Sequence, residues 1–422
     1  MKSRASFFIA LRYLLGRAHE GGRYLRGAAA GIAVSLVPII VTLIVADGMI
    51  RGILNRYLEL GTGHIQVFSH IGGAEALDEI VETVRGIDGV RGAWLETRGM
   101  GVLVGAGGRA GTTVRAIDPA FWQDEGSLRY LEVLEGTARL YSSDGMLLGG
   151  TLAGSIGARA GDTVRLMTLL ATPTGMILPR VTAFEVAGVV SAGYHELDAL
   201  WSIVTEEGGR RILGAEFGGS SLLVKIDDPY GGASAMAGEV RAALGPGFGV
   251  HTWRDLLRSQ YHSYESTRQL LMFIMALIVI VAAVNVSSAT SMLALERRRD
   301  IAVLKVAGAR PSGVAGVFLW GGFLTGVSGA ILGISLGLAI GASINGLIRA
   351  LEAALTFFSG LFGGGEVRIL DPDFYLETIP IIIDWPTVAL IGCFTIACSV
   401  AASWIPAWRA GRLKPMSLLR KY

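Results

Sequence analysis

Four long apolar stretches constrain this chain more than any other feature of its sequence. They cover residues 25–45, 270–293, 314–348 and 387–408. A helix needs about 20 predominantly apolar residues to cross the hydrocarbon core of a bilayer, and each stretch reaches that length. Proline and glycine are tolerated in membrane helices, so Pro38 and the many glycines of the third stretch do not argue against spanning. The sequence therefore predicts four transmembrane helices.

The charged residues separate along the chain in a matching way. Only 17% of the 422 residues are charged, whereas soluble domains carry about 25%. Residues 1–26, 294–312 and 409–422 together have a net charge of +13, while residues 50–267 and 349–385 have net charges of −7 and −4. Short basic loops stay in the cytoplasm. We therefore expect the three basic segments, including both termini, to be cytoplasmic and the two acidic segments to be exported.

The spans and loops predict an ordered series of segments. A cleaved signal peptide is the alternative for the first apolar stretch, but a signal core has only about 7–15 apolar residues, which is shorter than this stretch. Residues 3–15 place several apolar side chains near one helical face and suit a helix in the membrane interface. The predicted segments are a cytoplasmic or interfacial helix at 1–23, spans at 24–49, 268–293, 314–349 and 386–408, an exported domain at 50–267, a cytoplasmic coupling loop at 294–313, an exported loop at 350–385 and a cytoplasmic tail at 409–422.

The exported segment mixes strand and helix patterns. Six runs of β-branched, alternating residues predict strands, and the periodicity of 75–87 and 231–245 predicts amphipathic helices. The middle of the segment is rich in predicted strands, whereas both ends mix strand and helix patterns. We therefore expect an inserted lobe at about 111–215 within a second lobe. The predicted fold class is a membrane α-helical protein with four transmembrane helices and a large α+β periplasmic domain inserted between helices 1 and 2.

One segment of this domain, residues 171–180, predicts a protruding hairpin. It holds two prolines, a glycine and the apolar run Met176, Ile177 and Leu178 between two strand candidates. The simpler interpretation is a hairpin whose apolar residues fold back onto the domain. The functional interpretation is a docking finger, since apolar tips on rigid loops mark partner sites.

The motifs of catalytic chemistry are missing from the sequence. No phosphate-binding G-x-x-x-x-G-K-[ST] motif occurs, and neither do G-x-S-x-G or H-E-x-x-H. The six histidines are scattered, and the two cysteines, Cys393 and Cys398, both lie in the fourth apolar stretch. We therefore expect no catalytic residue, no metal site and no cofactor bound by this chain. A gradient-driven carrier is also disfavoured, because its spans would hold ionisable residues.

The loop between the second and third spans predicts a short amphipathic helix. Read from Glu296, it places Ile301, Leu304 and Lys305 near one face, Gly308 ends it, and Pro311 begins the next element. Such a helix between two spans could transmit a push from a partner. The alternative is a basic anchor on anionic lipid.

Two motifs carry a resemblance to a known family. The run ERRRDIAVLKVAGA at 296–309 resembles the coupling loop of the FtsX/MacB/LolC–LolE superfamily of ABC permeases, and ASWIPAWRAGRLKPMSLLR at 402–420 resembles its closing signature. The order of one span, a large exported domain and three spans is also similar. The stretches at 58–69, 188–213 and 371–388 resemble the lipoprotein-releasing LolC/LolE branch.

The resemblance implies three sets of site residues. ATPase coupling would use Glu296, Arg297, Arg298, Arg299, Asp300, Ile301, Leu304, Lys305 and Gly308. A hook for a periplasmic lipoprotein chaperone would be formed by Thr172, Pro173, Thr174, Gly175, Met176, Ile177, Leu178, Pro179 and Arg180. Lipoprotein binding is assigned to Val41, Val45, Met49, Leu271, Met272 and Met275, which could alternatively just face lipid or neighbouring helices.

The same resemblance implies partners and a location. The chain would sit in the bacterial inner membrane with two copies of a cytoplasmic ABC ATPase, which supply ATP and magnesium chemistry, and with a second permease that is either the same chain or a sister chain. Its cargo would be lipoproteins, handed to the chaperone without crossing the membrane, and no nucleic acid is involved. The rival functions are a MacB-type exporter subunit and an FtsX-type signalling permease.

Overall fold

The computed structural model describes residues 3–15, 21–171, 177–213, 219–361 and 378–413. The chain divides into two compact units, which are described separately here. The first unit comprises Met1–Met49, Tyr264–Leu361 and Ile379–Tyr422, and the second comprises Ile50–Ser263 and Phe362–Thr378.

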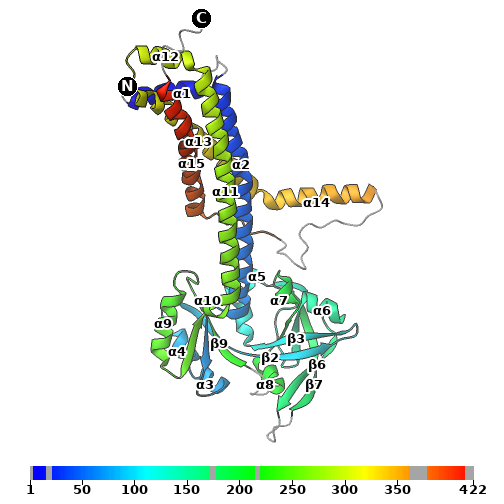
Figure 1. The fold of residues 1–422 in the computed structure, drawn as a ribbon. Helices are drawn as coiled ribbons and strands as arrows, with labels where there is room; N and C mark the ends of the chain where they lie inside the picture. The colour runs from blue at the N-terminus through cyan, green and yellow to red at the C-terminus, as the bar shows by residue number, and fades with distance from the viewer. Residues whose placement is uncertain (1–2, 16–20, 172–176, 214–218, 362–377, 414–422) are drawn as a thin grey trace. The chain divides into compact units, whose positions relative to one another are not determined.

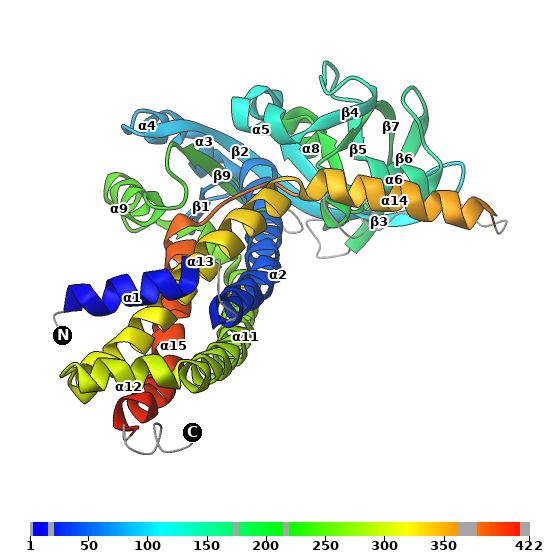
Figure 2. The ribbon, with the colours of Figure 1, turned by 90° about the horizontal axis from the view of Figure 1, so that it is seen from above.

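Four helices of the described residues are long and apolar enough to cross a membrane, as predicted. They are α2 (Gly21–Arg56), α11 (Arg258–Glu296), α13 (Pro311–Ala342) and α15 (Trp385–Arg412). The predicted N-terminal interfacial segment forms α1 (Ser3–Leu15). It lies against α13 (Figure 2). The Phe7 ring meets Trp320 edge to face at a centroid distance of 5.1 Å.

Glycines on one face of α13 bring it close to α2. A Cβ added at Gly333 would lie 2.8 Å from Leu36 Cβ, and one added at Gly337 would lie 2.8 Å from Ile40 Cβ. Small residues at four-residue spacing let membrane helices approach closely and gain van der Waals contact. The complete pairing sets Gly329, Gly333, Gly337 and Gly341 of α13 against Ile32, Leu36, Ile40 and Ile44 of α2.

The third span is shorter than the sequence predicted. Helix α13 ends at Ala342, and after Ser343 a separate helix, α14 (Ile344–Leu361), begins. The predicted span at 314–349 and the predicted loop at 350–385 are therefore wrong at this boundary. The physical reason is a change of pattern, because the regular glycines stop at Gly341 and polar residues then recur on one side of the helix from Asn345 onward.

The exported unit is built on one mixed sheet, and the α+β prediction is confirmed. Its described strands run in the order β10-β1-β9-β2-β3-β8-β5-β7-β4, with β6 pairing to β2 and β7. Two of the pairs, β3 with β8 and β5 with β7, are parallel. The strands are β1 (Ile65–Ser69), β2 (Val90–Val104), β3 (Arg109–Ile117), β4 (Glu132–Gly136), β5 (Gly145–Gly149), β6 (Thr163–Ala171), β7 (Ile177–Ser191), β8 (Trp201–Val204), β9 (Gly219–Ile226) and β10 (Phe248–Thr252).

Short helices connect these strands. The helix predicted at 75–87 is divided in two, and the one predicted at 231–245 is a single helix. In order they are η1 (Tyr57–Thr62, a π-helix), α3 (Ala74–Asp78), α4 (Val81–Arg85), η2 (Pro119–Gln123, a 3₁₀-helix), α5 (Glu125–Tyr130), α6 (Gly150–Ile156), α7 (His195–Asp198), α8 (Glu206–Ile212), α9 (Ala233–Leu244) and α10 (Trp253–Leu256).

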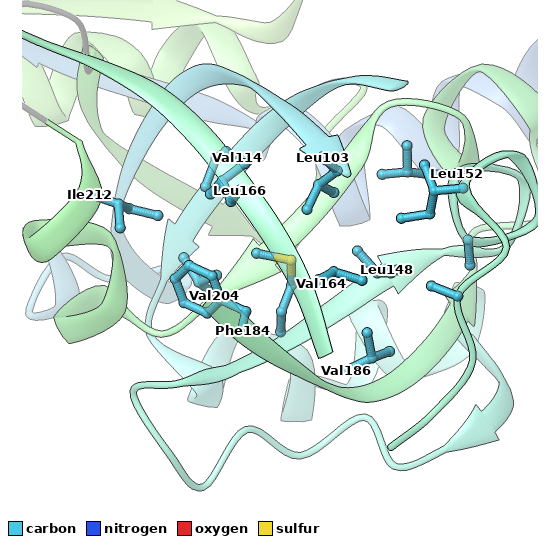
Figure 3. Close-up of a cluster of buried hydrophobic side chains, with 14 of the residues drawn as sticks. Leu103, Val114, Leu148, Leu152, Val164, Leu166, Phe184, Val186, Val204 and Ile212 are labelled. Atoms are coloured by element: carbon cyan, nitrogen blue, oxygen red, sulfur yellow. The ribbon is translucent and has the colours of Figure 1, made fainter. Parts of the chain in front are cut away.

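The predicted division of this unit into two lobes does not hold. The long strand β2 pairs with β9 through Val90–Arg98 and with β6 through Val102–Val104, so a single sheet passes through both predicted lobes. One core cluster is formed mostly by residues of the predicted insertion, where Val114 and Leu166 pack near Phe184, but it also includes Leu103 of the other predicted lobe (Figure 3). A second cluster joins residues of both predicted lobes, including Trp94 and Ile203. Shared sheet and shared core make the two parts one folding unit.

Candidate functional site

The loop between α11 and α13 forms the predicted helix, α12 (Arg298–Val306), between two tight joints. Gly308 follows it with a φ of +87°, a conformation that favours glycine. Ile301 is 2% exposed and packs into the core of the membrane unit, whereas Val303 and Val306 are 68% and 72% exposed. Residues three to four apart share a helix face, so the two valines form an outward apolar face opposite Ile301.

Several of the predicted coupling residues hold α12 in place. Lys305 Nζ donates hydrogen bonds to the carbonyl oxygens of Gly411 (2.7 Å) and Leu413 (2.5 Å) at the end of α15. These are among the carbonyls that a helix C-terminus leaves without intrahelical partners. Asp300 pairs with Arg297 at 3.3 Å and accepts a hydrogen bond from Tyr13 of α1 at 3.3 Å. The side chains of Arg297, Asp300 and Lys305 therefore brace the loop against its own unit.

The other predicted coupling residues differ in exposure. Glu296, Arg298, Arg299 and Gly308 are exposed, and Leu304 is half-buried. The predicted coupling set does not include Val303 and Val306, because the sequence analysis considered only the face that carries Ile301, Leu304 and Lys305. Their spacing, opposite Ile301, was the available signal.

An apolar cavity of about 190 Å³ lies between α11 and α15 in the membrane unit. Two of the six predicted lipoprotein-binding residues, Met272 and Met275, line it. Leu271 is half-buried against the same core, while Val41, Val45 and Met49 of α2 are partly buried and do not line the cavity. The complete lining is Met272, Met275, Ala276, Val279, Leu390, Ile391 and Phe394, of which only the two methionines were predicted.

A cluster of charges joins three parts of the membrane unit. Arg268 of α11 lies 3.2 Å from a carboxylate oxygen of Asp47 on α2 and 2.5 Å from one of Asp384, the residue before α15. It also donates a hydrogen bond to Thr387 Oγ1 at 3.2 Å. A buried charge needs a partner, and here one guanidinium pairs with two carboxylates. The cluster ties together the ends of three spans that lead to the exported unit.

The predicted hook lies at the end of a long hairpin. Strands β6 and β7 pair continuously from Thr163↔Glu185 to Ala171↔Ile177. Residues 172–176 of the hook lie outside the described residues, and the following Leu178, Pro179 and Arg180 are exposed. The hairpin has an apolar outer face that continues onto β2. This hairpin patch consists of Met100, Val104, Met167, Leu169 and Val181, each between 39% and 85% exposed.

Buried charges stabilise the exported unit beneath η1. Arg115 and Glu96 are both fully buried and lie 2.5 Å apart. Arg115 also donates hydrogen bonds to the carbonyl oxygens of Leu60 (2.6 Å) and Gly61 (3.3 Å) of η1, and burial lowers the pKa of its guanidinium to about 10. Lys225 pairs with Asp124 at 2.7 Å, and burial lowers the pKa of its ammonium group. The described residues contain no group of His, Cys, Asp and Glu that could hold a metal ion.

The class of protein follows from these features together with one family match. Residues 272–415 match the family described as FtsX-like permease C-terminal, which covers α12, α13 and α15. Four apolar spans, a large α+β unit and a short braced helix between the second and third spans thus resemble an FtsX-like ABC permease.

The chain is similar over almost its whole length to named relatives. It is 26% identical to the lipoprotein-releasing system transmembrane protein LolC of Neisseria meningitidis serogroup B, over 98% of each chain. It is 27% identical to LolC of Xylella fastidiosa, again over 98% of each. The resemblance to the LolC/LolE permeases is therefore confirmed, and it extends over almost the whole chain.

Among solved structures, the periplasmic region of MacB from Actinobacillus actinomycetemcomitans is 17% identical to this chain. It covers 49% of this chain and 95% of its own, with a TM-score of 0.32.

Proposed function

We propose that this chain is the permease subunit of an ATP-driven complex that extracts lipoproteins from the outer leaflet of the inner membrane. The observation that carries the proposal is the methionine-lined apolar cavity between α11 and α15. Methionine side chains adapt to ligands of variable shape, as acyl chains are. The described part of all four spans, moreover, offers no chain of ionisable residues of the kind that a carrier of ions requires.

The energetics of lipid anchors explain why such a cavity is needed. Each buried methylene is worth about 0.8 kcal/mol, so an acyl chain of about 15 methylenes is held by roughly 12 kcal/mol. Pulling two or three such chains into water would cost tens of kcal/mol. An apolar cavity that opens to the membrane and passes the chains to another apolar pocket avoids most of that cost.

The energy is supplied by partners in this proposal. Two cytoplasmic ABC ATPase subunits bind the exposed face of α12, hold the ATP and magnesium, and act on a pair of permeases. The second permease is the same chain or a sister chain. This chain is not an enzyme, and its termini and α12 are cytoplasmic, as the net charge of +13 in its basic segments favours.

The exported unit receives the chaperone in this proposal. The hairpin patch offers exposed apolar side chains on a rigid pair of strands, and such patches mark sites for protein partners. A periplasmic lipoprotein chaperone docked there, with the hook at Thr172–Arg180, accepts the acyl chains for delivery to the outer membrane.

A matched pair of substitutions on α11 tests the cavity. Met275→Trp fills the cavity, whereas Leu277→Trp places the same ring on a neighbouring residue that is 55% exposed. In spheroplasts depleted of the wild-type chain, we expect Met275→Trp to retain lipoproteins in the inner membrane and Leu277→Trp to release them. Immunoblots would verify equal amounts of both variants. Normal release by both would refute the cavity assignment. Normal release after depletion, with chaining or drug-sensitive cells, would instead support the signalling or exporter function.

A further inference from the structure

Helix α14 carries an apolar face that no other described part of the chain covers. None of its residues is buried. Spacings of three and four residues place one set of large apolar side chains on a single face of the helix. They are Leu347, Leu351, Leu355, Phe358 and Leu361, with exposed fractions between 39% and 65%.

The opposite face of α14 is polar and is engaged. It holds Asn345, Arg349, Glu352 and Thr356 at the same helical spacing. Asn345 Nδ2 donates a hydrogen bond to the Ile379 carbonyl oxygen (2.9 Å), and its Oδ1 accepts one from the Ile379 amide (3.0 Å). Glu352 and Thr356 also have interaction partners. The helix therefore uses its polar face for contacts within the protein and leaves the apolar face outward.

The ends of the neighbouring spans give the depth at which α14 begins. One residue, Ser343, separates it from α13, so it starts where that span ends. The two hydrogen bonds between Asn345 and the Ile379 backbone hold the start of α14 beside Ile379. Ile379 lies shortly before α15, which begins at Trp385. Trp385 is 62% exposed, and tryptophan at the end of a span is typical of the boundary between lipid and water.

The direction of α14 fits a position in the plane of that boundary. Figure 1 shows it running across the direction of α13 and α11 rather than along it. The apolar face of α14 follows directly in the sequence after the exposed apolar residues of α13. Of these, Leu332 and Leu336 are 59% and 54% exposed. A helix with one apolar and one polar face, attached to a span at its outer end, is suited to lie in the headgroup region of a bilayer.

We propose that α14 is an interfacial helix that inserts Leu351, Leu355 and Phe358 into the outer leaflet of the inner membrane. The occupant of its apolar face is thus lipid rather than a second protein chain. The assignment goes beyond the proposed function, because it holds for any cargo that the permease handles.

Site-directed spin labelling of the full chain in lipid nanodiscs tests this position. With Cys393 and Cys398 replaced by alanine, single cysteines are placed at Leu351, Leu355 and Phe358, and at Arg349 and Ala353 on the polar side. Leu277 on α11 and Tyr141 in the exported unit, 55% and 82% exposed, give the lipid and water references. Relaxation by dissolved oxygen and by a water-soluble nickel chelate then reports what each label contacts.

The expected result is a difference between the two faces. Labels at the three apolar positions should lose most of the nickel relaxation seen at Tyr141 and match Leu277 in oxygen relaxation, while labels at Arg349 and Ala353 should resemble Tyr141. Equal nickel relaxation at all five positions would show a helix in water. Shielding of the apolar positions from both reagents would show a protein occupant. Either result would overturn the proposal.

Discussion

A buried ion pair between Arg115 and Glu96 stabilises the end of η1, the π-helix at Tyr57–Thr62. The carbonyls at the end of η1 lack intrahelical partners, and Arg115 and Arg98 supply donors to Leu60 and Gly61. A guanidinium at a helix C-terminus also complements the helix dipole. Arg115 can be buried there only because Glu96, itself fully buried, neutralises it.

Glu96→Gln should therefore destabilise the protein. It leaves the Arg115 charge buried without its counter-charge, and breaking such a pair costs about 3–5 kcal/mol. Thermal unfolding of the purified full chain in detergent should show a clear loss for Glu96→Gln and little change for Glu207→Gln, whose side chain is exposed. An unchanged unfolding temperature for Glu96→Gln would contradict the structural role of the pair.

At the scale of elements, close contact between helices takes the place of the hydrophobic effect inside the membrane. Lipid is as apolar as leucine, so spans are held by van der Waals contact and polar contacts. The glycines of α13 supply the van der Waals contact with α2. Arg268 supplies polar contacts that join α2, α11 and the start of α15.

Gly333→Ala should separate α13 from α2. The added methyl group would lie 2.8 Å from Leu36 Cβ and 2.9 Å from the Ala33 backbone, and overpacking of this kind costs about 1–3 kcal/mol. Gly31→Ala on α2 is the matched control, because no atom lies within 4 Å of its added Cβ. Thermal aggregation in detergent measures both. Equal stability of the two variants would show that the glycine contact is dispensable.

The exposed valines of α12 should matter for partner binding rather than for folding. Val303→Asp with Val306→Asp places charge on an outward apolar face, and charge in the desolvated centre of an interface costs several kcal/mol. In the proposed complex an ATPase should copurify with the wild-type chain, and we expect the double variant to lose it while normal amounts of permease remain in the membrane. Tyr141→Asp, at an exposed exported position, should leave copurification unchanged. Retention of the ATPase by the double variant would rule out this face as its site.

At the scale of the whole molecule, the sequence predicted what depends on local pattern. Spans follow from the length of apolar runs, and β6 and β7 from alternating residues, so both were found. Contacts between distant residues were not predictable. Arg268 meets Asp47 across 221 residues, and the strand β2 joins the two predicted lobes through partners far along the chain. The short strands β4, β5, β8 and β10 and the α15 side of the cavity were missed for the same reason.

The charge partition also makes a prediction for the whole chain. Because the basic segments are expected in the cytoplasm, green fluorescent protein fused after Tyr422 should fluoresce. Alkaline phosphatase inserted at Tyr141, an exposed residue of the exported unit, should be active, since that enzyme folds only outside the cytoplasm. A dark C-terminal fusion together with inactive phosphatase at Tyr141 would reverse the assigned orientation.

The hydrogen bonds of Lys305 make α12 and α15 thermodynamically linked. Lys305 satisfies carbonyl oxygens at the end of α15, the helix that also contributes Leu390 and Phe394 to the apolar cavity. A protein that binds α12 more tightly in one position of α15 must, by reciprocity, shift α15 toward that position by the same free energy. A ligand that fills the cavity and fixes α15 would then alter the affinity of α12 for its partner by an equal factor.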